Sequence, residues 1–155
     1  MILVYILTFV GILLGVLLAY LARDELKSGK KYFILFYKTL LFILIIYLLY
    51  LSEINWWLLG IILGFLFSLV FSELYFFLGL AVFSSLNIYV AFITFLIGLP
   101  YGTLLYTKKR IKYYLVYSLV LFFVPALILL VNLPLTFVYS FVVGGIFSLF
   151  LRKIQ

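Results

Sequence analysis

Long apolar runs separated by short polar segments make up almost the whole sequence. A membrane-spanning helix needs about 20 apolar residues, because about 30 Å of hydrocarbon is crossed at about 1.5 Å per residue. The runs predict an all-α fold, a polytopic transmembrane helical bundle that forms one integral membrane domain over residues 1–155. About seven spans are expected, over residues 2–22, 33–51, 56–71, 74–86, 88–106, 113–131 and 135–151.

The number of spans depends on residues 56–106, a stretch with a single charged residue. By length it fits two spans, about 56–74 and 76–97, followed by a loop at 98–102, and the chain would then have six spans. Three spans here would put all 11 Lys and Arg residues on one side, whereas six spans would divide them between both sides. Because basic residues concentrate in cytoplasmic loops, we expect seven spans, with six and then five as the alternatives.

The seven-span arrangement places the N-terminus outside and the C-terminus in the cytoplasm, in a multi-pass protein of the cell membrane. Its weakest element is the fourth span, residues 74–86, which is roughly 20 Å long at helical rise. Such a helix must be lengthened by its polar ends or covered by its neighbours. The first run, residues 2–22, lacks the basic segment that precedes a secretory signal, so it is expected to remain as a span.

Composition excludes most other classes of protein. Hydrophobic residues make up 70% of the chain and charged residues 10%, against about 45–50% and about 25% in soluble domains. The chain has no His, no Cys and four acidic residues, so it offers no disulfide, no Cys or His metal site and no paired aspartates. We therefore expect no enzymatic activity, no metal and no cofactor.

The net charge of +7 indicates contact with lipid rather than with nucleic acid, because the basic residues flank apolar runs. Each basic residue near an anionic membrane surface contributes about 1 kcal/mol of attraction. The residues expected to contact lipid headgroups are Arg23, Lys27, Lys30, Lys31, Lys108, Lys109, Arg110 and Lys112.

Glycines four residues apart occur in two predicted spans, as Gly11 with Gly15 and as Gly60 with Gly64. Residues at this spacing share a helix face, and glycine there allows two helix backbones to approach closely. These faces pack either against other spans of the same chain or against a second copy or another membrane subunit. On this basis the first functional prediction is a non-enzymatic helix-packing or interaction subunit.

Glu73 is the only charged residue between Glu53 and Lys108. A carboxylate within the bilayer would indicate a proton or cation site, whereas a turn at the cytoplasmic surface would make it structural. Pro100, between Gly98 and Gly102, predicts a helix break whose carbonyl groups could coordinate ions, or simply a kinked span. Glu73 and Pro100 together support the alternative of a small transporter or channel, and the basic loops support a second alternative, a lipid-handling protein.

Overall fold

The computed structural model describes residues 2–22, 26–52, 57–85, 87–107, 111–128 and 133–152. Within these ranges the chain forms seven α-helices and no strand. The all-α fold class predicted from the apolar runs is therefore confirmed. The helices are α1 (Ile2–Leu21), α2 (Leu26–Leu51), α3 (Trp57–Val70), α4 (Leu74–Ser85), α5 (Ile88–Tyr106), α6 (Ile111–Ile128) and α7 (Leu135–Leu151).

Two helices differ from the predicted segments. Helix α2 begins at Leu26, seven residues before the expected start of its span, because lysine and leucine are good helix formers and continue the helix into the polar segment. Helix α5 runs without interruption through Gly98, Pro100 and Gly102, so the predicted helix break is wrong. Pro100 has no N–H to donate to the carbonyl of Leu96, one turn earlier, and the hydroxyl of Thr103 donates to the carbonyl of Pro100 itself at 2.7 Å.

The chain instead changes direction at Asn87, where the six-span alternative expects the interior of a helix. The side-chain oxygen of Asn87 accepts a hydrogen bond of 2.8 Å from the backbone N–H of Tyr89, which caps the N-terminus of α5. Its amide nitrogen donates to the hydroxyl of Tyr47 on α2 at 3.0 Å. The boundaries of the six-span alternative are therefore wrong, because 74–85 and 88–106 are separate helices.

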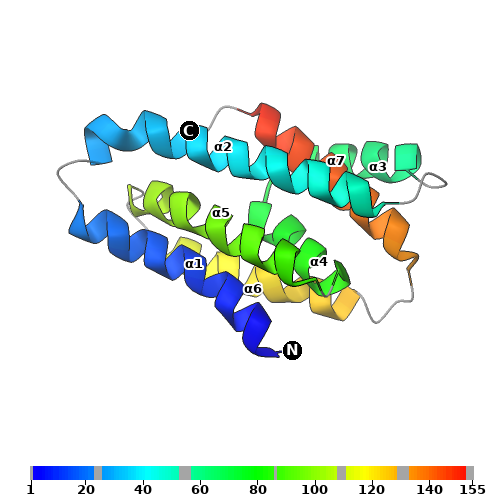
Figure 1. The fold of residues 1–155 in the computed structure, drawn as a ribbon, viewed down its shortest axis with the longest axis horizontal. Coiled ribbons are helices and arrows are strands. Elements are labelled where there is room, and N and C mark those ends of the chain that lie inside the picture. Colours follow the sequence, from blue (N-terminus) through cyan, green and yellow to red (C-terminus); the bar gives the residue numbers. More distant parts are fainter. Residues whose placement is uncertain are drawn as a thin grey trace.

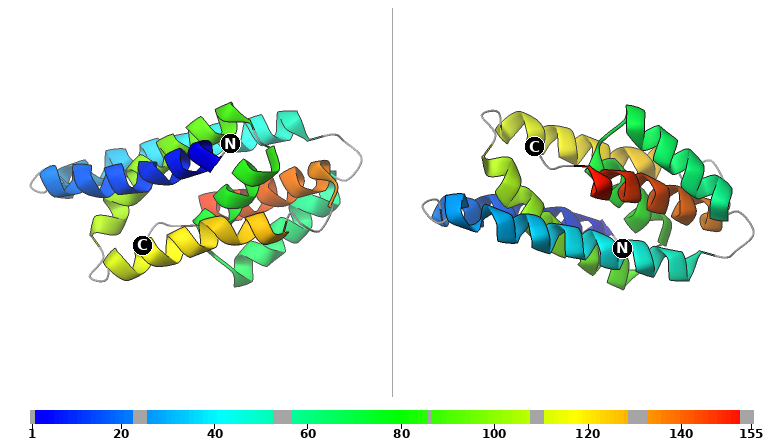
Figure 2. Two further views of the ribbon diagram at one scale, coloured as in Figure 1. Left: turned by 90° about the horizontal axis from the view of Figure 1, so that it is seen from below. Right: turned by 90° about the horizontal axis from the view of Figure 1, so that it is seen from above.

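The helices run roughly along the long axis of the molecule (Figure 1). Helix α1 packs along α5, and α3 packs along α7, while α2 contacts both α5 and α7. Helix α4 lies against α6, α7 and α5. The two further views show the same grouping, with α1 and α2 on one side and α3 beside α7 on the other (Figure 2).

Glycines hold α1 and α5 at backbone contact. A methyl group added at Gly11 would overlap the carbonyl oxygen of Phe95, and one added at Gly15 would overlap that of Leu99. Gly98 faces the backbone of Gly11 in return, because a methyl group added at Gly98 would come within 2.9 Å of the carbonyl carbon of Gly11. Since contacts advance in the same direction along both helices, α1 and α5 are parallel.

Helices α3 and α7 repeat this arrangement. An added methyl group at Gly64 would overlap the carbonyl oxygen of Phe141, and one at Gly60 would overlap the hydroxyl of Ser140. Gly144 of α7 lies against the carbonyl of Ile61 in return. These two helices are also parallel, because Gly60 lies near Phe137 and Gly64 near Phe141.

Helix α2 runs antiparallel to its neighbours. The ring of Tyr37 lies 6.1 Å from that of Tyr101, and the ring of Tyr47 lies 6.4 Å from that of Tyr89, centroid to centroid. The partners on α5 thus descend in number as those on α2 rise. In the described part of the chain, the packed pairs α1–α5 and α3–α7 are therefore parallel, and α2 is antiparallel to α5.

Helix α4 is the central element of the bundle. Ten of its 12 residues are buried, including the whole run from Leu74 to Val82. Gly79 lies against the carbonyl of Phe122 on α6, and the ring of Phe77 fills the space beside Gly145 of α7. A helix this short is covered by its neighbours, one of the two solutions that its length required.

Two helices, over Gly29–Leu51 and Ile88–Tyr106, combine the length and the apolar composition that a membrane crossing requires. They support association with a membrane, whereas helix length alone does not establish seven crossings. Within the described residues, the other apolar helices are shorter: Ile6–Leu21, Trp57–Val70, Leu74–Ser85, Ile111–Leu127 and Leu135–Leu151.

We predict that Gly15→Ala destabilises the fold by about 1–3 kcal/mol, the usual cost of overpacking, because the added methyl group meets the α5 backbone. Gly29→Ala is the matched control, since its methyl group would meet only ring carbons of Phe33, at 3.5 Å and beyond. Thermal unfolding in detergent, followed by circular dichroism, measures both. A Gly15→Ala variant as stable as Gly29→Ala would show that the α1–α5 backbone contact is not formed.

Candidate functional site

Several hydroxyl groups in the interior donate to a carbonyl of their own helix. Ser68 donates to the carbonyl of Phe65 at 2.9 Å, Ser84 to that of Ala81 at 3.2 Å, and Ser140 to that of Phe137 at 2.9 Å. Such bonds use carbonyl oxygens that already belong to the helix ladder, so the side chains need no partner on another element. They are features of packing and do not mark a site.

Two buried oxygens differ from this pattern. Among the described residues, the hydroxyls of Tyr75 and Thr94 have no hydrogen-bond partner. Tyr75 is 1% exposed, at the beginning of α4. A buried hydroxyl without a partner costs about 1–3 kcal/mol, which makes Tyr75 a candidate site residue.

Tyr75 belongs to a cluster of three tyrosines from three helices, which we call the tyrosine cluster: Tyr37 of α2, Tyr75 of α4 and Tyr101 of α5. The ring centroids of Tyr75 and Tyr101 are 5.2 Å apart, and those of Tyr37 and Tyr101 are 6.1 Å apart. A side-chain hydrogen bond links Tyr101 to Ser118 of α6. Four helices therefore bring hydroxyl groups to one place.

Glu73 lies beside this cluster, in the link of residues 71–73 between α3 and α4. Its side chain is partly exposed, and its charge acts on the hydroxyls of Tyr101 and Tyr117. Tyr101 lies five residues before the end of α5, and Tyr117 lies six residues after the start of α6. At 1.5 Å per residue, these two tyrosines are roughly 7–9 Å from the ends of their helices.

The link between α3 and α4 also lies near the middle of the long axis of the molecule rather than at an end (Figures 1 and 2). Glu73 thus lies at the junction of the two short helices α3 and α4. The arrangement is one carboxylate followed inward by tyrosine hydroxyls, the last of them fully buried. Chemically, these groups supply oxygen ligands and one negative charge.

Pro100 is buried on α5 next to Tyr101, and its carbonyl is already bonded by Thr103. The structure therefore brings Glu73 close to the residue that follows Pro100, while the carbonyl that loses its helical donor to the proline is that of Leu96. Of the basic residues predicted to contact headgroups, Lys30, Lys31 and Lys112 are exposed. Arg23, Lys108, Lys109, Arg110 and the side chain of Lys27 lie outside the described residues.

The predicted packing glycines, Gly11, Gly15, Gly60 and Gly64, face α5 and α7 of the same chain. Their faces are therefore occupied and offer no surface to another subunit. A homo-oligomer or a membrane partner would have to contact other parts of the bundle.

Sequence reasoning missed the tyrosine cluster because the chain contains 14 tyrosines and 18 phenylalanines, spread through every apolar run. No spacing distinguishes Tyr37, Tyr75 and Tyr101 from the rest. The one available signal was proximity to residues already singled out, since Tyr75 follows Glu73 by two positions and Tyr101 follows Pro100 directly.

Comparisons with models of protein families, with curated proteins and with solved structures find no match to this chain. The interpretation of the site therefore rests on its own geometry.

We predict that Tyr75→Phe leaves thermal stability unchanged or raises it, by up to about 1–3 kcal/mol, because the variant removes a buried hydroxyl that has no partner among the described residues. Tyr139→Phe is the matched control: its hydroxyl donates to the carbonyl of Ser84 at 3.4 Å, so its loss should lower stability by about 0.5–1.5 kcal/mol. Unfolding in detergent tests both, and a clear loss of stability in Tyr75→Phe would contradict the assignment.

Proposed function

We propose that this chain is an integral membrane protein that crosses the bilayer seven times. The observation that carries this proposal is the distribution of side chains between surface and interior. Large apolar residues are exposed on most of the described helices, for example Val70 at 91%, Leu21 at 71% and Leu127 at 68%. The buried residues include Thr8, Ser118 and Ser148. Only a lipid solvent makes such an exterior favourable.

The directions of the helices support seven crossings. Consecutive spans alternate in direction, so helices whose numbers differ by two or four must be parallel, as α1 is to α5 and α3 is to α7. Over their full bounds α1 has 20 residues and α6 has 18, close to the length of a span. Helix α3, with 14 residues, rises roughly 21 Å and requires local thinning of the bilayer. Helix α4, with 12 residues, rises roughly 18 Å and is covered by its neighbours.

With seven crossings, all 11 basic residues lie on one side, which by the charge rule is the cytoplasm. The N-terminus is then outside and the C-terminus inside. The link between α3 and α4, which carries Glu73, then faces the cytoplasmic side.

We predict that single cysteines at Gly29 and Lys109 are labelled from the same side of the membrane, because the four crossings between them, α2 to α5, return the chain to the cytoplasmic side. The chain has no cysteine of its own, so Gly29→Cys and Lys109→Cys report without background. Ser52→Cys, Asn87→Cys and Asn132→Cys should be labelled from outside, with an impermeant maleimide on intact cells. Labelling of positions 29 and 109 from opposite sides would reject seven crossings.

We further propose that the Glu73 site binds a proton or a monovalent cation in the course of transport. Glu73 supplies one negative charge, and Tyr101 and Tyr117 place hydroxyl oxygens within reach of its field. The buried hydroxyl of Tyr75 lies further inside the bundle, in the same cluster as Tyr101, and provides the next oxygen ligand for a cation that moves inward from Glu73.

This proposal takes precedence over that of a helix-packing or interaction subunit because the glycine faces that suggested such a subunit are filled within the chain. An interaction role would rest on the lipid-facing surface alone. No enzymatic step is proposed, because the cluster combines one carboxylate with hydroxyl groups and lacks a second base or nucleophile within the described residues.

We expect Glu73→Gln to reduce cation flux at least tenfold, since the amide keeps the shape of the side chain but carries no charge. The measurement uses purified protein in liposomes, with a pH-sensitive dye for proton flux and a sodium-sensitive dye for sodium flux. Glu53→Gln removes the acidic charge between α2 and α3 and is the control that should retain flux. Equal flux in the wild type and Glu73→Gln would rule out this site.

A further inference from the structure

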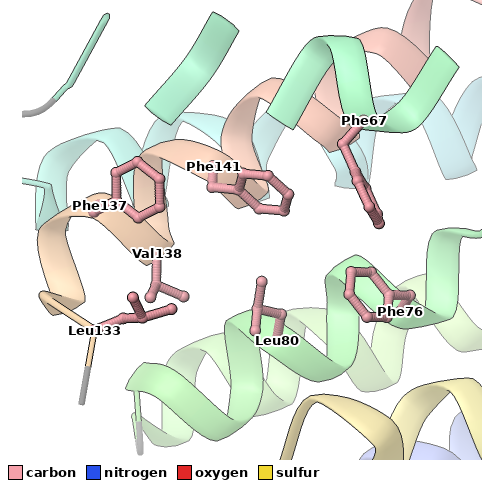
Figure 3. Close-up of a pocket in the computed structure, with 7 residues that line it drawn as sticks. All are labelled: Phe67, Phe76, Leu80, Leu133, Phe137, Val138 and Phe141. Carbon is pink, nitrogen blue, oxygen red and sulfur yellow. The ribbon is translucent and has the colours of Figure 1, made fainter. Parts of the chain in front are cut away.

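A groove with an entirely apolar lining lies between α3, α4 and α7 (Figure 3). Its volume is about 210 Å³, and we call it the aromatic groove. Phe67 of α3 and Phe76 of α4 line one end, as the close-up shows, and Leu133 and Phe137 line the other. Leu80, Val138 and Phe141 complete its lining.

The shape of the groove follows the helix axis. Phe137 and Phe141 lie four residues apart on α7, so they form a stripe roughly 6 Å long at helical rise, and Leu133 lines the groove just before the helix begins. Phe76 and Leu80 of α4 form the facing wall, also four residues apart. The space is thus a slot parallel to the helices.

The lining restricts what can fill this slot. Water needs two to four polar partners in a cavity, and none of the lining side chains provides one. A transmembrane helix, about 10–12 Å across with its side chains, is too wide for 210 Å³. At about 30 Å³ each, the volume holds roughly seven groups the size of a water molecule, which suits a segment of hydrocarbon chain.

A cationic group lies beyond one end of the groove. The Arg152 guanidinium donates to the carbonyl of Ser68 at 2.7 Å, and Ser68 follows the groove residue Phe67. Arg152 is 11 residues beyond Phe141 on α7, which is about three turns and so nearly the same helix face. A guanidinium has five N–H donors, so donors remain for an anion after the bond to Ser68.

From these observations we propose that the aromatic groove and Arg152 together bind one anionic membrane lipid, with a hydrocarbon chain in the groove and the headgroup phosphate at Arg152. This site is separate from the Glu73 site and rests only on the proposal that the chain is embedded in a membrane. The headgroup would lie on the cytoplasmic side, at the level where α3 and α7 end.

The test measures lipid binding to the purified chain in detergent, by native mass spectrometry and by the rise in unfolding temperature on adding lipid. Dioleoyl-phosphatidylglycerol is the anionic probe and dioleoyl-phosphatidylcholine the neutral one. Arg152→Gln should weaken phosphatidylglycerol binding at least tenfold and remove its advantage over phosphatidylcholine. Lys112→Gln removes the same charge from an exposed position on α6 and should leave binding unchanged.

Filling the groove with larger side chains tests whether the hydrocarbon chain of the lipid lies in it. Leu80→Trp and Val138→Phe should each weaken binding of both lipids at least tenfold. Two groove-filling variants are used so that the test still stands if one of them misfolds. Leu58→Trp adds the same ring at a surface position of α3 that is 68% exposed, and it should bind both lipids like the wild type. Glycerol phosphate without a hydrocarbon chain should give no rise in unfolding temperature.

Three outcomes would overturn the proposal: phosphatidylglycerol binding that survives Arg152→Gln, lipid binding that survives both groove-filling variants, or a dimer that these variants dissociate. The last outcome would assign the groove to a second copy of the chain. Glu73→Gln should bind lipid normally, so a failure at the cation site leaves this test intact.

Discussion

Direct backbone contact between parallel helices organises this bundle. Between helices in lipid there is little hydrophobic driving force, so association depends on van der Waals contact at short range. Gly11, Gly15 and Gly98 provide it for α1 and α5, and Gly60, Gly64 and Gly144 provide it for α3 and α7. These two pairs form the framework on which α2 and α4 pack.

The stagger between the two pairs creates the candidate site. Helix α4 has 12 residues and begins at Leu74, and its link to α3 lies near the middle of the long axis of the molecule rather than at an end (Figures 1 and 2). Glu73 lies in this link, near Tyr101 and Tyr117. A longer α4 would place the carboxylate at the surface, where water would replace the tyrosine hydroxyls as its surroundings.

The same short helices shape the outer surface. Since α3 ends at Val70 and α7 at Leu151, Arg152 reaches back to the last turn of α3 and caps its carbonyl groups. Lys38 of α2 lies nearby in the bundle, 5.3 Å from the centroid of the Phe150 ring. Cationic groups thus gather where the apolar surface of α3 and α7 ends, as membrane interfaces favour.

The sequence alone determined the all-α class and the approximate bounds of seven helices, because apolar runs and polar interruptions are local properties of the chain. It also marked Gly11 and Gly60 as packing positions, since spacing by four defines a helix face. It did not determine that Gly98 and Gly102 are partners of the first glycines. It also left open whether Pro100 breaks a helix or lies within a kinked span, because that depends on the helices packed against the segment.

The tyrosine cluster, the aromatic groove and the setting of Glu73 were decided by the tertiary structure. Each depends on which helices lie side by side and by how much they are displaced along their axes, and no local pattern records that displacement. Tyr75 and Phe141 look in the sequence like any other aromatic residue of an apolar run. Only packing makes one a buried hydroxyl without a described partner and the other the wall of an apolar slot.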